Sequence, residues 1–194
     1  LVDPPPATDV SAKTGLAWLA LGGVGGRPQG VQGERAALLA GCYLLYLSIF
    51  SVGQDFLGFQ WDLLLLEAGF LAPWLGTGSA LVPWLYRLLL FRFMFLAGCV
   101  KLLSGDPNWS SLRALGFHFE TQPLPTPLAW YAHHLPPALL EAGVVATFVV
   151  ELLLPFLFFA PRRPRMLAAA GTIVLETLIL LTGNYNFFNL LTPR

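Results

Sequence analysis

The chain has 194 residues, of which 56% are hydrophobic, 13% aromatic and 11% charged, and its formal net charge is zero. A soluble domain carries about 25% charged residues, so this composition leaves too few charges to cover a water-facing surface. The apolar residues also occur in runs that are too long for ordinary soluble helices. These features predict a membrane protein, and the zero net charge argues against nucleic acid as a partner.

The first 35 residues predict a Pro/Gly-rich linker. Prolines occupy positions 4–6, and glycines are frequent between Gly22 and Gly33, so no regular element is expected there. No leader with a basic start and an apolar centre is recognisable. The chain stops at Arg194, directly after an ordered-looking motif, and we therefore expect a fragment of a longer protein.

Residues 36–192 are expected to form a membrane helix bundle. Four apolar segments have spanning length, for which about 20 residues are needed; they are 36–54, 81–103, 138–159 and 166–183. A fifth segment, 61–75, is shorter and contains Pro73, so it either crosses with a tilt or enters the membrane and returns. The predicted fold class is all-α, a polytopic membrane helix bundle with about five transmembrane segments, of which the second is either spanning or re-entrant.

Basic residues predict the orientation of this bundle. Arg162, Arg163 and Arg165 lie in a short connection, which the positive-inside rule places on the cytoplasmic side. The polar loop 104–137, one crossing away, is then lumenal. Asn108 begins an Asn-Trp-Ser triplet in this loop, which is a glycosylation candidate and agrees with that orientation.

Ionisable residues interrupt the apolar segments, although each costs about 3 kcal/mol at the centre of a bilayer on insertion scales. They are Asp55, Asp62, Glu67, Arg87, Arg92, Lys101, Glu141, Glu151 and Glu176. Those that do not lie at the interface must pair or line a polar interior. The residues assigned to this interior are Asp62, Glu67, Arg87, Arg92 and Glu151. We expect ion pairs that fix helix packing, with a reactive polar cavity or a proton path as alternatives.

Helical geometry separates these charges. At 100° per residue, Asp62 and Glu67 are about 140° apart and Arg92 is about 180° from Lys101, so the members of each pair face different neighbours. Lys101 ends an apolar segment, where a lysine usually extends to the interface. In an apolar cavity it would instead lose basicity and could act as a general base; the sequence favours the interfacial position.

The loop 104–137 contains all the histidines, His118, His133 and His134. His118 and Glu120 would share a face on an extended backbone, which the prolines of the loop favour. No spacing here is diagnostic of a metal site, and we expect no metal and no cofactor. Trp130 and Tyr131 are expected in the interfacial aromatic belt. The motif at 183–191 (GNYNFFNLL) is expected to anchor the chain at the interface.

Five blocks in chain order resemble the lipase maturation factor family, over about residues 40–192. They read GQDFLGFQWDLLLLEAGFLAP, LLFRFMFLAGCVKLLSGDPNW, FHFETQPLPTPLAWYAHHLP, VELLLPFLFFAP and TGNYNFFNLLT. The resemblance implies a multi-pass protein of the endoplasmic reticulum membrane that assists the folding, assembly and maturation of secreted lipases such as lipoprotein lipase. It also implies that the lipases bind a C-terminal domain absent from this chain. The residues of this chain itself are expected to contact membrane lipid. The expected role is non-catalytic.

A shorter resemblance concerns Lys101. The pattern Phe95-Leu-Ala-Gly98, Lys101-Leu102 and Trp109 is similar to a segment of vitamin K-dependent gamma-glutamyl carboxylase, and there the matching lysine is a general base. This implies an alternative, a membrane-embedded enzyme that uses Lys101 as general base on a lipid or isoprenoid substrate. A transporter is the third possibility, and the sequence lacks the repeated broken helices typical of that class.

Overall fold

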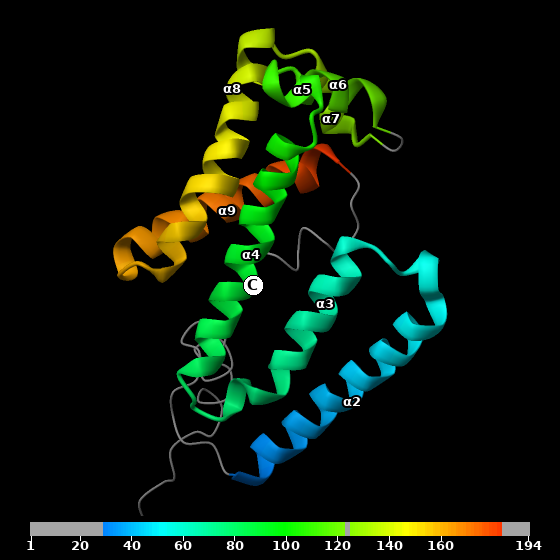
Figure 1. Ribbon diagram of the computed structural model, residues 1–194, viewed down its shortest axis with the longest axis vertical. Helices are drawn as coiled ribbons and strands as arrows, with labels where there is room; N and C mark the ends of the chain where they lie inside the picture. Colours follow the sequence, from blue (N-terminus) through cyan, green and yellow to red (C-terminus); the bar gives the residue numbers. More distant parts are fainter. Residues whose placement is uncertain (1–28, 123–124, 184–194) are drawn as a thin grey trace, which may run out of the picture.

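The computed structural model describes residues 29–122 and 125–183, and the regular structure of this part is helical (Figure 1). Three helices there are long and apolar enough to cross a membrane, namely Gln32–Gly53, Pro137–Phe159 and Arg162–Thr182. The predicted all-α membrane fold is therefore confirmed. Helix α4 (Leu81–Leu103) has the expected bounds and a spanning length of 23 residues, but it contains three basic residues. The number of about five spans stays a prediction.

Helix α2 (Gln29–Gly53) begins within the range in which a linker was expected. Gly30 and Gly33 lie in its first turns, where each glycine costs about 1 kcal/mol relative to alanine. The neighbouring glutamine, glutamate and arginine residues favour a helix, and the apolar span that follows extends it. Residues 1–28 lie outside the described part of the chain.

Helix α3 (Gln60–Leu71) has 12 residues and is therefore about 18 Å long, much shorter than the hydrocarbon core of a bilayer. Pro73 ends the regular helix, because proline lacks an amide hydrogen, and the chain continues as the 3-10 segment Ala72–Gly76. A 3-10 turn, Gln54–Phe56, joins α2 to α3. The two helices form an antiparallel pair at the edge of the molecule (Figure 1).

Helix α4 lies between this pair and the C-terminal half (Figure 1). The C-terminal half consists of α8 (Pro137–Phe148), the π-helical turn Val149–Leu153, the 3-10 segment Leu154–Phe159 and α9 (Arg162–Thr182). One face of α4 contacts α3, and the other contacts the π-helical turn and the 3-10 segment. The predicted basic connection at 161–165 forms the start of α9.

The apolar core lies where α4, the 3-10 segment and α9 meet. Met94, Phe158 and Ala168 are buried there. Phe91 contacts Phe156 and Phe159, with ring centroids 5.2 and 5.4 Å apart. These contacts hold α4 and the C-terminal half together and determine which residues can meet between them.

The loop 104–137 contains three short helices, α5 (Pro107–Ser110), α6 (Ala114–Thr121) and α7 (Pro127–His133). The prediction that its prolines favour an extended backbone is therefore wrong for these segments. Pro107 and Pro127 occupy the first turn of a helix, where the missing amide hydrogen costs nothing. Asp106 and Thr126 precede them as N-caps and accept hydrogen bonds from backbone amides at 2.9 and 3.2 Å.

The loop also closes the end of α9. The Gln122 side-chain amide donates to the Thr182 carbonyl at 3.1 Å, and the Thr126 hydroxyl donates to the Leu181 carbonyl at 2.5 Å. The last carbonyls of a helix have no partner within the helix. These two side chains supply the missing donors and tie the loop to α9.

Candidate functional site

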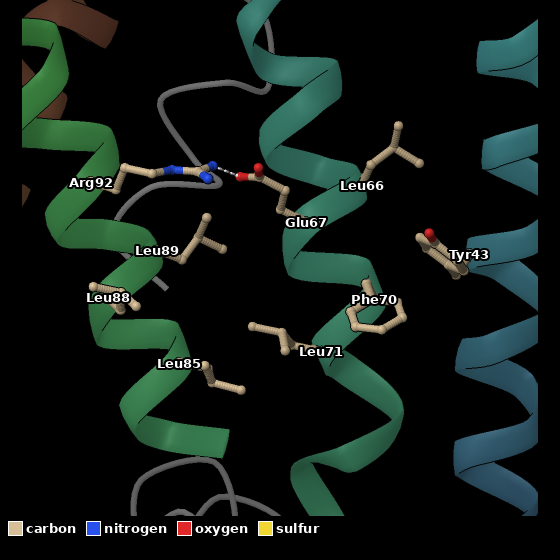
Figure 2. A pocket seen from close by; sticks show the side chains of 9 residues that line it. All are labelled: Tyr43, Leu66, Glu67, Phe70, Leu71, Leu85, Leu88, Leu89 and Arg92. Atoms are coloured by element: carbon tan, nitrogen blue, oxygen red, sulfur yellow. Dashed lines mark hydrogen bonds and ion pairs between the residues drawn. The ribbon is translucent and has the colours of Figure 1, made fainter. Parts of the chain in front are cut away.

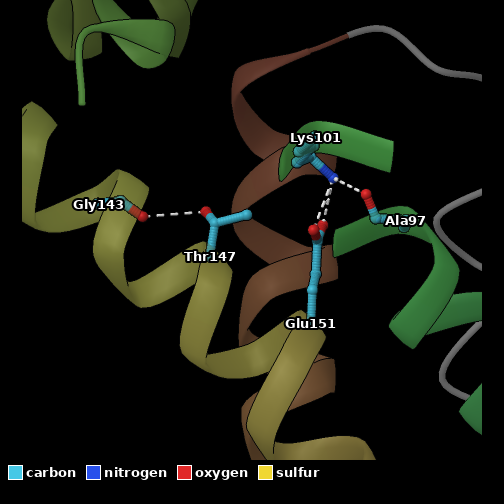
Figure 3. Close-up of polar contacts among 5 residues, drawn as sticks. All are labelled: Ala97, Lys101, Gly143, Thr147 and Glu151. Carbon is cyan, nitrogen blue, oxygen red and sulfur yellow. Dashed lines mark hydrogen bonds and ion pairs between the residues drawn. The ribbon is translucent and has the colours of Figure 1, made fainter. Parts of the chain in front are cut away.

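Lys101 and Glu151 form an ion pair between α4 and the π-helical turn. The Lys101 ammonium donates to both carboxylate oxygens of Glu151, at 2.6 and 2.7 Å (Figure 3). The Glu151 side chain is 7% exposed and that of Lys101 is 22% exposed. Lys101 therefore points into the molecule, and the expectation that it extends to the interface is wrong, because Glu151 provides a nearer partner.

The local backbone explains how Glu151 reaches this position. Pro155 has no amide hydrogen to donate to the carbonyl four residues earlier, which is that of Glu151. The helix widens into the π-helical turn just before this proline, and turns of this kind occur frequently at functional sites. Glu151 is thus presented on a locally widened helix that faces α4.

Gly98 lets the two helices approach closely at the same level. A Cβ atom at this position would lie 2.6 Å from Leu152 Cδ2 and 3.1 Å from Glu151 Cβ. Small residues permit such close backbone approach between membrane helices. Gly98 therefore sets the separation at which Lys101, one turn further along α4, meets Glu151.

Further polar and aromatic groups surround the ion pair. The Lys101 ammonium lies 5.4 Å from the centre of the Trp109 ring, which in turn contacts Phe148 with centroids 5.7 Å apart. Glu176 of α9 is 5% exposed and lies within electrostatic range of both Glu151 and Lys101. We call Lys101, Glu151 and Glu176 the Lys101 cluster; it joins α4, the π-helical turn and α9 inside the bundle.

Two buried threonines accompany the cluster. Thr147 lies one turn before Glu151, and its hydroxyl donates to the Gly143 carbonyl at 2.9 Å (Figure 3). Thr172 lies one turn before Glu176 and is 1% exposed, and its hydroxyl oxygen has no hydrogen-bond partner among the described residues. The polar interior therefore extends along α8 and α9 beyond the charged groups.

A second polar site lies on α3. Glu67 forms an ion pair with Arg92 of α4 at the edge of a groove of about 400 Å³ (Figure 2). The rest of the groove is mainly apolar, with walls from α2, α3 and α4; its lining includes Tyr43, Leu66, Phe70, Leu85 and Leu88. Unlike Glu151, both charged side chains stay partly exposed, at 39% for Glu67 and 53% for Arg92.

Asp62 lies about 140° around α3 from Glu67. It is 2% exposed, and its carboxylate accepts a hydrogen bond from the Tyr46 hydroxyl of α2. Its other oxygen has no partner among the described residues. Asp62 and Glu67 thus contact different helices, as their angular separation requires. Arg87 lies with its guanidinium 5.6 Å from the centre of the Trp84 ring.

The histidines of the loop lie on different elements. His118 is on α6, where burial lowers the pKa of its imidazole, and Glu120 is exposed on the same short helix. His133 and His134 are exposed at the end of α7, where His134 Nδ1 lies 2.7 Å from the Trp130 carbonyl. The helical backbone separates His118 from Glu120 by about 200°, so they do not share the face expected for an extended chain.

Asn108 lies within α5, and its backbone amide donates to the Asp106 carboxylate. A separate groove of about 410 Å³ lies between α6 and α8 and is lined in part by Arg113, Glu120 and Glu141. Among the described residues, no group of three or more His, Cys, Asp and Glu side chains could hold a metal ion. The 183–191 motif lies outside the described residues, apart from Gly183.

Comparison with known proteins gives the family. The family sequence model described as lipase maturation factor transmembrane domain matches residues 7–193. The chain belongs to the lipase maturation factor family. Lipase maturation factor 2 of Gallus gallus is 52% identical over 169 residues, which cover 80% of this chain and 24% of that protein. The Homo sapiens protein of that name is 51% identical over 168 residues, which cover 76% of this chain and 24% of that protein.

The other branch of the family is more distant. Lipase maturation factor 1 of Mus musculus is 36% identical over 167 residues, which cover 80% of this chain and 29% of that protein. The chain thus spans about a quarter of the length of the curated relatives that it matches. No solved structure matches it.

Within this membrane domain, the geometry of Lys101 favours a structural role over a catalytic one. A general base needs a neutral amine within reach of the substrate proton. The nitrogen of Lys101 instead contacts both oxygens of Glu151, and the Ala97 carbonyl lies 3.5 Å away. Removing one partner of a buried ion pair typically costs 3–5 kcal/mol, so this contact is positioned to hold α4 against the C-terminal half.

Lys101 and Glu151 each stand out in the sequence as charges in apolar segments, but their contact was not predicted. The contacts of Tyr46 with Asp62 and of Trp109 with Lys101 were not predicted either. A usable signal was Pro155, four residues after Glu151, because a proline in an apolar helix indicates a local distortion. The pairing itself depends on packing between segments 50 residues apart.

Proposed function

We propose that this chain forms the membrane-embedded part of a factor that assists the folding, assembly and maturation of secreted lipases. The observation that carries the proposal is the similarity to lipase maturation factor 2 proteins, at about half of all aligned positions over most of the chain. The described part of the chain supports a scaffold role, because its buried charges are arranged to join helices.

We propose lipoprotein lipase as one client and the endoplasmic reticulum membrane as the location, because secreted lipases fold in that compartment. Contact with the client is proposed for the C-terminal domain of the longer protein. In support, the matched relatives are about four times as long as the aligned segment.

The experiment that tests the function uses the full-length protein in cells that lack their own maturation factors. Secreted lipoprotein lipase activity is compared for the wild type, Lys101→Arg, Lys101→Ala and the double variant Lys101→Met with Glu151→Met. Rescue by the wild type is expected. Failure of the wild type to rescue, at normal expression, would overturn the proposed client.

The same variants separate a scaffold from an enzyme. If Lys101 holds helices together, the double variant replaces the ion pair by apolar side chains of similar length, which is often tolerated, and rescue is expected. If Lys101 were a general base, the double variant would be inactive at equal expression, as would Lys101→Arg. Protein level is measured for every variant so that loss of folding is not read as loss of chemistry.

Orientation can be tested at Asn108. Lumenal exposure predicts that the triplet Asn108-Trp109-Ser110 is available to the glycosylation machinery. A mobility shift removed by glycosidase treatment, and absent in both Asn108→Gln and Ser110→Ala, supports the lumenal position of the loop. Accessibility of an introduced cysteine in this loop to a membrane-impermeant reagent from the cytoplasmic side would contradict it.

A further inference from the structure

The groove of about 410 Å³ between α6 and α8 lies where a membrane-spanning segment begins. This segment, Pro137–Phe159, starts with α8, and α6 packs beside that helix (Figure 1). Pro137 and Glu141 both line the groove, and the helix rises by about 6 Å from one to the other. The headgroup region on each side of a bilayer is about as thick. The groove therefore lies at the depth of lipid headgroups.

The walls of the groove are held in place by close contacts. Helix α6 packs tightly on α8, since a Cβ atom at Gly143 would lie 2.6 Å from Leu115 Cδ1. Leu112 lines the groove with a φ of +59°, in the left-handed region that a leucine rarely adopts. The Arg113 amide fixes this turn by donating to the Asn108 carbonyl at 2.9 Å. Backbone held in this way is frequent at ligand sites, and the groove is preformed.

Charged side chains of both signs line the groove. Arg113 and Glu120 are seven residues apart and therefore lie on one face of α6, and Glu141 lines the groove from α8. All three are exposed, and none has an ion-pair partner among the described residues. Phe117 and Leu140 add apolar surface. The groove thus combines one cationic group, two anionic groups and apolar walls at the boundary of the membrane.

We propose that this groove binds the headgroup of phosphatidylethanolamine. The Arg113 guanidinium matches the phosphate, for which arginine has a suitable fork of donors. Glu120 and Glu141 accept hydrogen bonds from the primary ammonium of the headgroup. Phe117 and Leu140 contact the start of the acyl chains.

The charges also select among phospholipids. The net charge of the groove is negative, which opposes a lipid whose headgroup has a phosphate and no amine, such as phosphatidylglycerol. Phosphatidylcholine has a cationic headgroup nitrogen, but this nitrogen carries no hydrogen to donate to the two carboxylates. Of these three lipids, only phosphatidylethanolamine can satisfy both the guanidinium and the carboxylates.

Native mass spectrometry of the purified full-length protein in a neutral detergent tests the selectivity. Phosphatidylethanolamine, phosphatidylcholine and phosphatidylglycerol with identical acyl chains are titrated separately. We expect one tightly bound phosphatidylethanolamine per chain, with a Kd at least about tenfold lower than for either other lipid. Equal binding of the three lipids, or preference for one of the other two, would overturn the proposal.

Charge variants test the position of the site. Arg113→Gln and Glu141→Gln are each expected to weaken phosphatidylethanolamine binding by about tenfold. Glu34→Gln and Arg35→Gln remove exposed charges from the start of α2, outside the groove, and should bind like the wild type. Unchanged binding in both groove variants would overturn the assignment of the lipid to this groove.

A variant that fills the groove gives a test without a change of charge. Gly116 lines the groove, and a Cβ atom there would meet no atom within 4 Å. Gly116→Leu is therefore expected to fold and to abolish the tight binding. Gly41→Leu on α2, where a Cβ atom also meets nothing within 4 Å, is the matched control and should bind normally. If Gly116→Leu melts like the wild type and still binds the lipid, the proposal is overturned.

Two further measurements separate a lipid from other occupants. Free phosphoethanolamine in excess should displace the lipid only weakly, since it lacks the acyl chains; complete displacement at equal concentration would show a site for a soluble phosphoamine instead. A photo-reactive amino acid in place of Phe117 should cross-link to lipid in cells. Cross-linking to protein alone would show that a protein partner fills the groove, and would overturn the lipid assignment.

Discussion

Lys101 and Glu151 are 50 residues apart in the chain, and the ammonium of one lies 2.6 and 2.7 Å from the two carboxylate oxygens of the other. The contact joins the end of α4 to a π-helical turn inside the C-terminal half. It occurs beside Gly98, where the backbones are closest, and beneath the Trp109 ring. A buried charge pair is thus positioned where two parts of the bundle and the loop 104–137 meet.

Breaking this pair on one side is expected to be costly. Lys101→Ala leaves the Glu151 carboxylate buried beside Glu176 without its counter-charge, and we expect a loss of about 3–5 kcal/mol in the free energy of unfolding. The double variant Lys101→Met with Glu151→Met is expected to lie within about 1–2 kcal/mol of the wild type. The measurement is an SDS titration of the purified protein, followed by circular dichroism.

Arg87→Met is the matched control, because Arg87 is also on α4 but contacts only the Trp84 ring in the described structure. It is expected to cost about 0.5–2 kcal/mol at most. Equal destabilisation by Arg87→Met and Lys101→Ala would show that any positive charge on α4 matters equally, and that the pair with Glu151 has no special role.

Much of the bundle could be predicted from apolar length alone. The segment 81–103 coincides with α4, and the segments 138–159 and 166–183 correspond closely to the C-terminal spans. Helical periodicity also separated the charges correctly. Arg92 contacts Glu67 of α3, whereas Lys101, on the opposite side of α4, contacts Glu151 of the π-helical turn. These features depend on local spacing, which a sequence contains directly.

The partners of these charges could not be predicted, because they depend on how distant segments pack. Three basic residues and six acids allow many pairings, and the sequence gives no distance between helices. The helices of the loop are a different case. Asp106-Pro107 and Thr126-Pro127 each combine an N-cap residue with a proline at the first helical position. This signal predicts a helix start, and the richness of the loop in proline obscured it.

Gly98 is expected to tolerate no side chain. In Gly98→Ala the added Cβ would lie 2.6 Å from Leu152 Cδ2 and 2.8 Å from its Cγ, so either the Leu152 side chain or the two helices must shift. We expect a loss of about 1–3 kcal/mol, as for other overpacked positions, measured in the same SDS titration. Gly116→Ala on α6 meets no atom within 4 Å and is expected to stabilise slightly. A neutral Gly98→Ala would show that the helices are loosely packed at the ion pair.

The loop is expected to protect the end of α9. Thr126→Val removes the hydroxyl that donates to the Leu181 carbonyl and also caps α7, and we expect a loss of about 1–2 kcal/mol. Hydrogen exchange should accelerate at the Gly183 amide, which bonds the Ile179 carbonyl in the last turn of α9. Thr126→Ser keeps the hydroxyl and should behave like the wild type.

Thr121→Val tests whether this effect belongs to the contact between loop and helix. The Thr121 hydroxyl donates only within its own helix, to the Phe117 carbonyl at 2.7 Å. Its loss is expected to leave exchange at the Gly183 amide unchanged. Faster exchange in both variants would mean that general loosening of the loop, and not the contact of Thr126 with α9, controls the end of the helix.

The stability of the loop is expected to depend on pH through His118. Burial lowers the pKa of this imidazole in the folded protein, relative to about 6.5 in an unfolded chain. The unfolded state therefore binds more protons than the folded state as pH falls below about 6.5. Stability contributed by the neutral imidazole is fully present above that pH and is lost progressively on acidification.

The measurement is the melting temperature of the purified protein between pH 8 and pH 5. The difference between the wild type and His118→Gln should grow smaller as pH falls, since glutamine carries no charge at any of these values. His134→Gln removes an exposed imidazole and serves as the matched control. A difference between wild type and His118→Gln that is constant over this range would contradict the prediction, because burial of a neutral imidazole requires the folded state to resist its protonation.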